Sequence, residues 1–415
     1  MDVKRGFLIR FISGFAVVTA LAALAACSDS GGDGDSGNSN DFGSIARASL
    51  GSVTINPGET ATVKPAASLN RKAEFTQGGG YVNAVTFDSD QPIVISSMAS
   101  GGSRFFYTDG SVYGDTRVAY FYNWAWGSSD TTQTLVMPPM YTLADLFPSG
   151  DYEFEVLNAG SGPATVNVYQ TRKNDSSFSS GQIDLNFFVY RAGEDNPVIP
   201  SQAEAEKVVG YINNIFAPIG VSVGTFNVEF IDDTNAVNQV LDDGGMEAFL
   251  AQASRATAGR GDKGINCFIM PRLAGDTLGM DGSIPGPGII HGTPKSGLIA
   301  QAAPLGWAMA GRTEHETDQV VLAKILAHEM GHYFGLFHTT ESDGSRTPIL
   351  SDRPHCGNDN DDDGDGTVTG PECRGKGADY LMFWVFDSGL VSSGDAQVTL
   401  SPMEGQLINT FPAVN

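Results

Sequence analysis

Three histidines and one glutamate stand close together in the pattern H-E-x-x-H-x-x-G-x-x-H, which runs from His328 to His338. Imidazole nitrogens bind zinc well, and three such donors leave one position of a four-coordinate ion open for water or substrate. His328, His332 and His338 are therefore predicted to bind one Zn²⁺ ion. Glu329 is predicted to act on the water at the open position without binding the metal.

The chemistry expected of such a centre is hydrolysis. Bound zinc lowers the pKa of a water ligand from about 15.7 to about 7. Glu329 would accept a proton from the attacking water and later deliver it to the leaving amine, as general base and then general acid. This arrangement predicts cleavage of a peptide bond without a protein nucleophile. Hydrolysis of a non-peptide amide would use the same groups and stays open.

A helix is expected to position the first two histidines. Residues four apart leave the same face of a helix, one turn apart, so His328 and His332 can share a metal. Thr317 and Asp318 are candidates for the helix N-cap and an acidic first turn. The helix should be buried on one side because an apolar run precedes the motif: Val320, Val321, Leu322, Ile325 and Leu326.

The third histidine requires a turn. A straight helix could not bring the side chain of His338 to the metal that the other two histidines bind. Gly335 lies between them and can adopt positive φ, which would end the helix and return the chain. Gly335 is therefore predicted to have a structural role in the site.

The motif resembles the signature of the metzincin zinc endopeptidases, which also carry a methionine in a tight turn beneath the histidines. Met382, within Asp379–Trp384, fits that place. The strings Phe334–Thr339 and Leu400–Gln406 resemble the pappalysin-type (cytophagalysin) branch. The resemblance implies an α+β catalytic domain with a twisted mixed sheet, an active-site helix and a C-terminal subdomain that holds the Met-turn. Trp384 departs from members that place a zinc-binding tyrosine there, so no fifth protein ligand is expected.

The first 27 residues are typical of a targeting segment. Lys4, Arg5 and Arg10 precede an apolar stretch that is too short for a confident membrane span. The stretch ends in Leu-Ala-Ala-Cys, which resembles a bacterial lipobox and predicts lipidation of Cys27. Residues 28–44 would be a flexible tether. A lipid-anchored protein of the bacterial envelope is expected, sorted to the outer membrane because Ser28 follows the cysteine; an ordinary secretory signal is the alternative.

Charge and length limit the partners. The formal net charge is −24 over 415 residues. Such an acidic chain is a poor partner for nucleic acid or an anionic membrane, so contact with the membrane is expected through the lipid anchor only. The length suits two domains, and a monomer is expected. The expected partner is a protein or peptide substrate.

Residues 45–180 are predicted to form an accessory β-sandwich, since short alternating runs are separated by Gly, Ser, Asn and Asp. Tyr152–Val156 and Ala164–Tyr169 look like a hairpin. An inhibitory prodomain is the competing role. Aromatic residues could form a core or a binding face, which keeps open a surface binding protein with an inert zinc domain: Phe105, Phe106, Tyr107, Tyr120, Phe121, Tyr122, Trp124 and Trp126.

Residues 181–415 are predicted to form the zinc protease domain. Alternation predicts a strand over 183–189, and apolar residues on one face predict a helix over 208–216. Further strands are expected over 226–231 and 265–270. The Gly-rich stretch from Gly279 to Leu298 is expected to hold the edge strand that would pair with an extended substrate, and Ser296–Ala300 is the candidate segment.

Cysteines and aspartates suggest further features of this domain. Cys356 and Cys373 bracket a loop and are predicted to form a disulfide, whereas Cys267 is expected to be a free buried thiol. The bracketed loop could bind Ca²⁺. The match to a helix-loop-helix calcium loop is incomplete. The twelfth position of such a loop is a glutamate, but here Gly370 stands there and Glu372 comes two residues later. A solvated acidic loop is therefore the alternative. The candidate ligands are Asp359, Asp361, Asp363 and Asp365.

Overall fold

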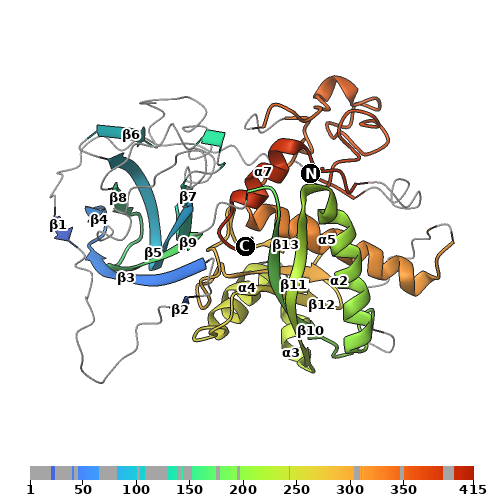
Figure 1. The fold of residues 1–415 in the computed structure, drawn as a ribbon, viewed down its shortest axis with the longest axis horizontal. Helices are drawn as coiled ribbons and strands as arrows, with labels where there is room; N and C mark the ends of the chain where they lie inside the picture. The colour runs from blue at the N-terminus through green and yellow to red at the C-terminus, as the bar shows by residue number, and fades with distance from the viewer. Residues whose placement is uncertain are drawn as a thin grey trace.

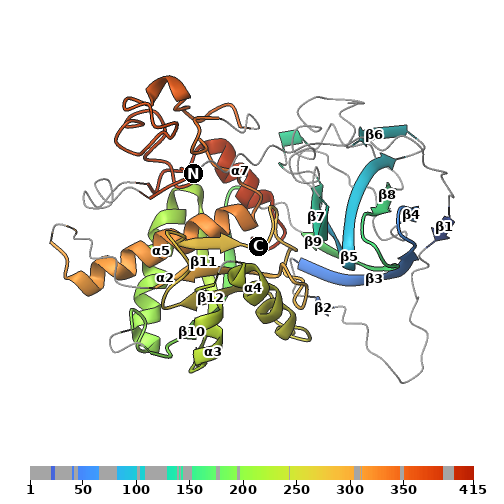
Figure 2. The same cartoon turned by 180° about the vertical axis from the view of Figure 1, so that it is seen from behind.

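The computed structural model describes residues 20–23, 40–41, 45–64, 82–100, 103–107, 129–137, 140, 142–143, 152–173, 178–193, 197–242, 244–302, 309, 311–345, 350–386 and 397–415. Cys27, most of the tether and Tyr120–Trp126 lie outside these residues, so their predicted roles stay predictions. None of the helices formed by the described residues is long and apolar enough to cross a lipid bilayer. Two sheets lie next to each other (Figures 1 and 2).

The N-terminal sheet is organised by one long strand. The 19-residue β5 pairs through its first half with β7 and β9, and through its second half with β6 and β8. Figure 1 shows its curvature. The nine strands formed by the described residues belong to one continuous sheet. The predicted β-sandwich, which would need two separate sheets, is therefore not confirmed and stays a prediction. The strands are β1 (Ala20–Ala23), β2 (Asn40–Asp41), β3 (Ile45–Ile55), β4 (Thr60–Lys64), β5 (Val82–Ser100), β6 (Ser103–Tyr107), β7 (Asp130–Met137), β8 (Tyr152–Asn158) and β9 (Ala164–Lys173).

The predicted hairpin between the segments that form β8 and β9 is wrong. At Ile93, strand β5 pairs with Asp130 of β7 on one side and with Asn158 of β8 on the other. At residues 83–88, β5 pairs with β7 on one side and with β9 on the other, so β8 and β9 both lie on the side opposite β7. Strands β8 and β9 therefore follow one another along the same edge of β5. The turn residues between them were typical of a hairpin, but here they join consecutive strands because the sheet bends at this point.

Asp88 lies at the bend of β5, where the pairing register shifts. Its buried carboxylate accepts a 3.0 Å hydrogen bond from the Thr132 hydroxyl. Burial raises the pKa of Asp88 to about 6. The folded state thus holds a proton that the unfolded chain releases near pH 4, so the stability contribution of Asp88 falls as the pH rises from about 4 to about 6.

Asp88→Asn is accordingly expected to raise the free energy of unfolding above pH 6, by up to about 3 kcal/mol at 1.36 kcal/mol per pKa unit. Below pH 4 the variant and the wild type should be equally stable. Urea unfolding at pH 4 and pH 7.5 measures this difference. Asp276→Asn, an exposed change in a loop of the second domain, is the control. A variant less stable than the wild type at pH 7.5 would contradict the assignment.

The second sheet has the order β11-β10-β12-β14-β13, with only β13 antiparallel to its neighbour. The strands expected over 183–189, 226–231 and 265–270 are confirmed as parts of β10, β11 and β12, and the helix expected over 208–216 is part of α2. The elements are β10 (Gly181–Tyr190), α2 (Gln202–Phe216), η2 (Ala217–Ile219), β11 (Val221–Ile231), α3 (Thr234–Gln239), α4 (Gly245–Ala256), β12 (Ile265–Met270), β13 (Gly279–Asp281), β14 (Gly297–Gln301), α5 (Glu314–Tyr333), η3 (Asn358–Asn360) and α7 (Pro402–Thr410).

Helices cover both faces of this sheet. Successive side chains of a strand point to opposite faces. Phe187 packs in the core that includes residues of α2 and α5, whereas Phe188 stacks on Phe268 in a second core with α4. All six residues of β12 are buried, as expected for a strand covered on both faces. Helix α5, which carries the histidine motif, packs with α2 in the first of these cores.

The assignment of the edge strand to Ser296–Ala300 is wrong. Ser296 directly precedes β14, and the other four residues fall in β14, which lies inside the sheet between β12 and β13. The edge strand is the short β13. Leu298, Ile299 and Ala300 are fully buried and suit an interior strand, whereas the three residues of β13 are too few to show an alternating pattern.

The two sheets are joined by buried polar contacts. Side chains of the N-terminal sheet donate to main-chain carbonyls of the segment 287–289 and of α7. Because the acceptors are backbone atoms, the contacts depend on the path of the chain in those segments. The bonds run from Arg47 Nη1 to Ile289 O (2.8 Å), from Thr86 Oγ1 to Pro287 O (3.4 Å), from Thr171 Oγ1 to Gly288 O (2.7 Å) and from Lys173 Nζ to Asn409 O (2.8 Å).

Candidate metal centre

Helix α5 begins four residues earlier than the sequence indicated. Its N-cap is Thr313, not Thr317: the Thr313 hydroxyl accepts from the Glu316 amide, and the Glu316 carboxylate accepts from the Thr313 amide. This capping box satisfies two backbone donors reciprocally. Thr317 instead donates its hydroxyl to the Thr313 carbonyl inside the helix. The earlier start adds a further turn of helix ahead of the histidines.

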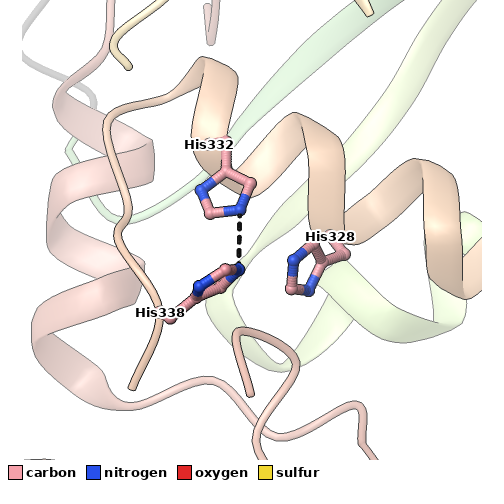
Figure 3. Close-up of side chains that lie close together, drawn as sticks. All are labelled: His328, His332 and His338. Carbon is pink, nitrogen blue, oxygen red and sulfur yellow. Dashed lines mark hydrogen bonds between the residues drawn. The ribbon is translucent and has the colours of Figure 1, made fainter. Parts of the chain in front are cut away.

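The structure brings His328, His332 and His338 together. Their ligand atoms all lie within 4.8 Å of one another, so the three residues could hold a metal ion. Figure 3 shows the first two imidazoles leaving α5 and the third reaching back from the loop that follows. The Nε2 atoms of His332 and His338 are 3.2 Å apart.

Hydrogen bonds fix which nitrogen of each ring faces the centre. The Nδ1 of His328 donates to Leu381 O and that of His332 to Leu336 O, each at 2.7 Å. The Nδ1 of His338 donates to the Glu341 carboxylate at 2.8 Å. These acceptors hold the proton on Nδ1, which leaves the Nε2 lone pair of each neutral ring free to bind a metal.

The spacing of the His332 and His338 nitrogens fits a tetrahedral ion. Nitrogen ligands about 2.05 Å from such an ion stand about 3.3 Å from one another, close to the 3.2 Å found here. Without a metal ion between them, the neutral His332 and His338 rings, each protonated on Nδ1, would point the lone pairs of their Nε2 atoms at each other across 3.2 Å, which is repulsive. Burial lowers the pKa of His328 to about 3 and holds the pKa of His332 well below its ordinary value. Both rings are therefore neutral, the form that binds metals.

Glu329 is buried between α5 and the edge strand β13. A Cβ on Gly279 would lie 2.5 Å from its Oε1, so only glycine leaves room for the carboxylate. The carboxylate accepts a hydrogen bond from the backbone of Asp281, and burial raises the pKa of Glu329 to about 8. The side chain of Asp281 is a second buried carboxylate, whose pKa is raised by burial and by the charge of Glu329. Strand β13 lies at the start of the Gly-rich stretch in which an edge strand was expected, but the sequence did not single out Asp281.

Gly335 has φ of 102° directly after α5. The Leu336 amide donates to Gly331 O at 2.9 Å and the Gly335 amide donates to His332 O at 2.8 Å. This pair of bonds is a Schellman motif, in which a left-handed residue ends a helix. The chain turns here and carries His338 back towards the helix.

Met382 is fully buried beneath the helix. Its sulfur packs against Gly331, where a Cβ would collide with it. Two main-chain carbonyls of this turn accept hydrogen bonds from residues of the site. Leu381 O accepts from His328, and Met382 O accepts from the Thr339 amide at 2.8 Å. The turn thus contacts both the helix and the segment that follows His338.

The predicted disulfide between Cys356 and Cys373 is present, and Cys267 is a free buried thiol. In the bracketed loop, carboxylate oxygens of Asp361, Asp363 and Glu372 lie within 4.8 Å of one another. Asp359 and Asp365, both predicted as ligands, are not in this group. The Asp361 carboxylate already accepts hydrogen bonds from two backbone amides of the loop. Exposed acidic groups also often lie close together without an ion, so calcium binding stays a prediction.

No family model matches this chain, and no curated protein matches it. Among solved structures it is similar to metalloproteinase-II from Bacteroides fragilis, at 10% identity and a TM-score of 0.30, over 59% of this chain and 62% of the other. The chain therefore spans about three fifths of the length of that metalloproteinase chain. It is also similar to the structure of a chaperone–substrate complex, at 13% identity and a TM-score of 0.24, over 40% and 26% of the two chains.

Proposed function

We propose that this chain is a zinc-dependent endopeptidase. The observation that carries the proposal is the convergence of three imidazoles, each held by its Nδ1, at the end of a helix that also carries the buried carboxylate of Glu329. His328, His332 and His338 would hold the zinc ion. When bound, the metal supplies a water of lowered pKa and stabilises negative charge on the oxygen of the attacked carbonyl.

The residues of the chain perform the remaining steps. Glu329 accepts the proton of the attacking water and delivers it to the leaving amide nitrogen. Its burial favours this exchange, since a carboxylate with a pKa near neutrality can both accept and release a proton. The open edge of β13 lies beside Glu329, and we assign it the substrate backbone, paired as an added strand.

We further place the chain in the metzincin group and in its pappalysin-type branch. The support is the sequence pattern, the packing of Met382 under the helix, and the capping box of α7, in which Ser401 and Glu404 bond reciprocally. The indole of Trp384 donates to Val368 O at 2.8 Å, towards the disulfide loop, which supports a centre with three protein ligands.

The cellular setting that we propose follows from the sequence alone. Lipidation at Cys27 would hold the protein on the bacterial envelope, with the catalytic domain beyond a flexible tether. The substrate would be a protein or peptide, and the Asp-rich loop would bind calcium through Asp361, Asp363 and Glu372.

Metal removal tests the proposed function. The chain that starts after Cys27 should contain about one zinc per molecule and cleave casein or a peptide library. Chelation should abolish cleavage, and added zinc should restore it. Folded protein without metal would refute the proposal. Zinc binding without cleavage of any peptide in the library would instead favour a surface binding protein whose zinc domain is inert.

A further inference from the structure

The three imidazoles are not held in the same way. His328 and His332 donate to neutral main-chain carbonyls, whereas His338 donates to a charged side chain, the Glu341 carboxylate, at 2.8 Å. The His338 and Glu341 side chains are 25% and 37% exposed. His338 is also the one ligand outside helix α5, on a loop where the backbone alone fixes a side chain less firmly.

A tight turn fixes Glu341. The Gly344 amide donates to Glu341 O and the Glu341 amide donates to Ser345 O, both at 2.9 Å. Gly344 has φ of 72°, and a Cβ there would collide with the backbone of Asn358. The turn therefore packs closely against the start of the disulfide-bracketed loop.

Further bonds join this turn to that loop. The Val368 amide donates to Ser342 O at 2.8 Å, and His355 Nε2 donates to Gly344 O at 2.9 Å. The Cys356 amide donates to the Thr340 hydroxyl at 3.3 Å. A continuous set of contacts thus runs from the loop closed by Cys356 and Cys373, through the turn, to the carboxylate on His338.

We propose that Glu341 is a positioning residue for the metal centre: it orients His338, keeps the proton on Nδ1 and thereby strengthens metal binding. The inference rests on the proposed function, since it assumes that His338 binds the metal. A carboxylate behind a ligating imidazole fixes the ring and raises its basicity, and loss of such a partner lowers metal affinity about 10- to 100-fold. A half-exposed ion pair without this role would leave metal affinity unchanged.

The test compares Glu341→Ala and Glu341→Gln with the wild type, each as the full chain after Cys27. Metal-free protein is titrated with Zn²⁺ against a chelator of known affinity, and with Co²⁺ to record its visible spectrum. We expect Glu341→Ala to bind zinc about 10- to 100-fold more weakly with an altered Co²⁺ spectrum. Glu341→Gln should lose less affinity, because its amide oxygen can still accept from Nδ1. Glu247→Gln, an exposed change on α4, is the control.

The outcomes separate this inference from the proposed function. Wild-type protein that binds no zinc would defeat both. Wild-type protein that binds zinc and cleaves peptides, with Glu341→Ala binding zinc equally tightly, would overturn the role of Glu341 alone. If the alanine variant does not fold, Glu341→Gln decides: wild-type affinity and an unchanged Co²⁺ spectrum would count against the inference, and an intermediate affinity supports it.

Discussion

Glu329→Ala is expected to retain its zinc and to lose peptide cleavage by a factor of about 10² to 10⁴, the usual contribution of general acid–base catalysis. The side chain is buried against Gly279 and follows His328 in helix α5, but it is not one of the group that could hold a metal. Its removal should take away the proton acceptor while the ligand set stays intact. Steady-state cleavage of one peptide, with zinc content measured on the same samples, gives both quantities.

Glu329→Gln is the matched variant, because it keeps the shape of the side chain and removes the charge. It should be as inactive as the alanine variant and at least as stable as the wild type, since a neutral amide replaces a buried carboxylate. Wild-type kcat in either variant would show that another group moves the proton. Loss of zinc together with activity would show that Glu329 holds the centre together.

Arg353→Met is expected to lower the free energy of unfolding by about 3–5 kcal/mol, the usual effect of removing one partner from a buried ion pair. Arg353 Nη1 lies 3.2 Å from the Glu404 carboxylate, and the two side chains are only 2% and 0% exposed. Without Arg353 the charge of Glu404 would stay buried and unpaired. Urea unfolding measures the change. Lys207→Met removes an exposed pair with Glu204 and should leave the stability nearly unchanged.

The double variant Arg353→Met with Glu404→Gln separates the pair from its charges. It should recover part of the lost stability, because no ionised group is then buried alone. A double variant as unstable as the sum of the two single changes would contradict this account. Arg353 also donates to Phe337 O at 3.1 Å, next to His338, so the single variant should in addition bind zinc more weakly.

The sequence predicted that the three histidines lie close together, because their geometry is local. The spacing of His328 and His332 on a helix, and the glycine before His338, determine the arrangement within eleven residues. Three of the five strands of the second sheet, β10, β11 and β12, were also predictable, since strands in a buried parallel sheet are rich in apolar residues, as in Ile265–Met270.

Features that depend on contacts distant in sequence could not be predicted. The choice between β13 and β14 as edge strand depends on pairing with β12, not on either segment alone. The N-cap is an exception: Thr313 and Glu316 form a local T-x-x-E pattern, which is the sequence signature of a capping box and favours Thr313 over Thr317. Glu341 looks like any charged loop residue until the turn at Gly344 aims it at His338.

The contacts between the two sheets decide how much of the chain an active fragment must contain. The segment 287–289 accepts hydrogen bonds from Arg47 and Thr171 of the N-terminal sheet. It also donates one, from the Ile289 amide to the Tyr333 hydroxyl at 3.2 Å, and Tyr333 directly follows His332 in helix α5. A fragment cut at residue 181 would keep every ligand yet expose the back of the loop that braces the helix. When domains are exchanged between related proteins, the hybrid should therefore be active only if both sheets come from the same protein.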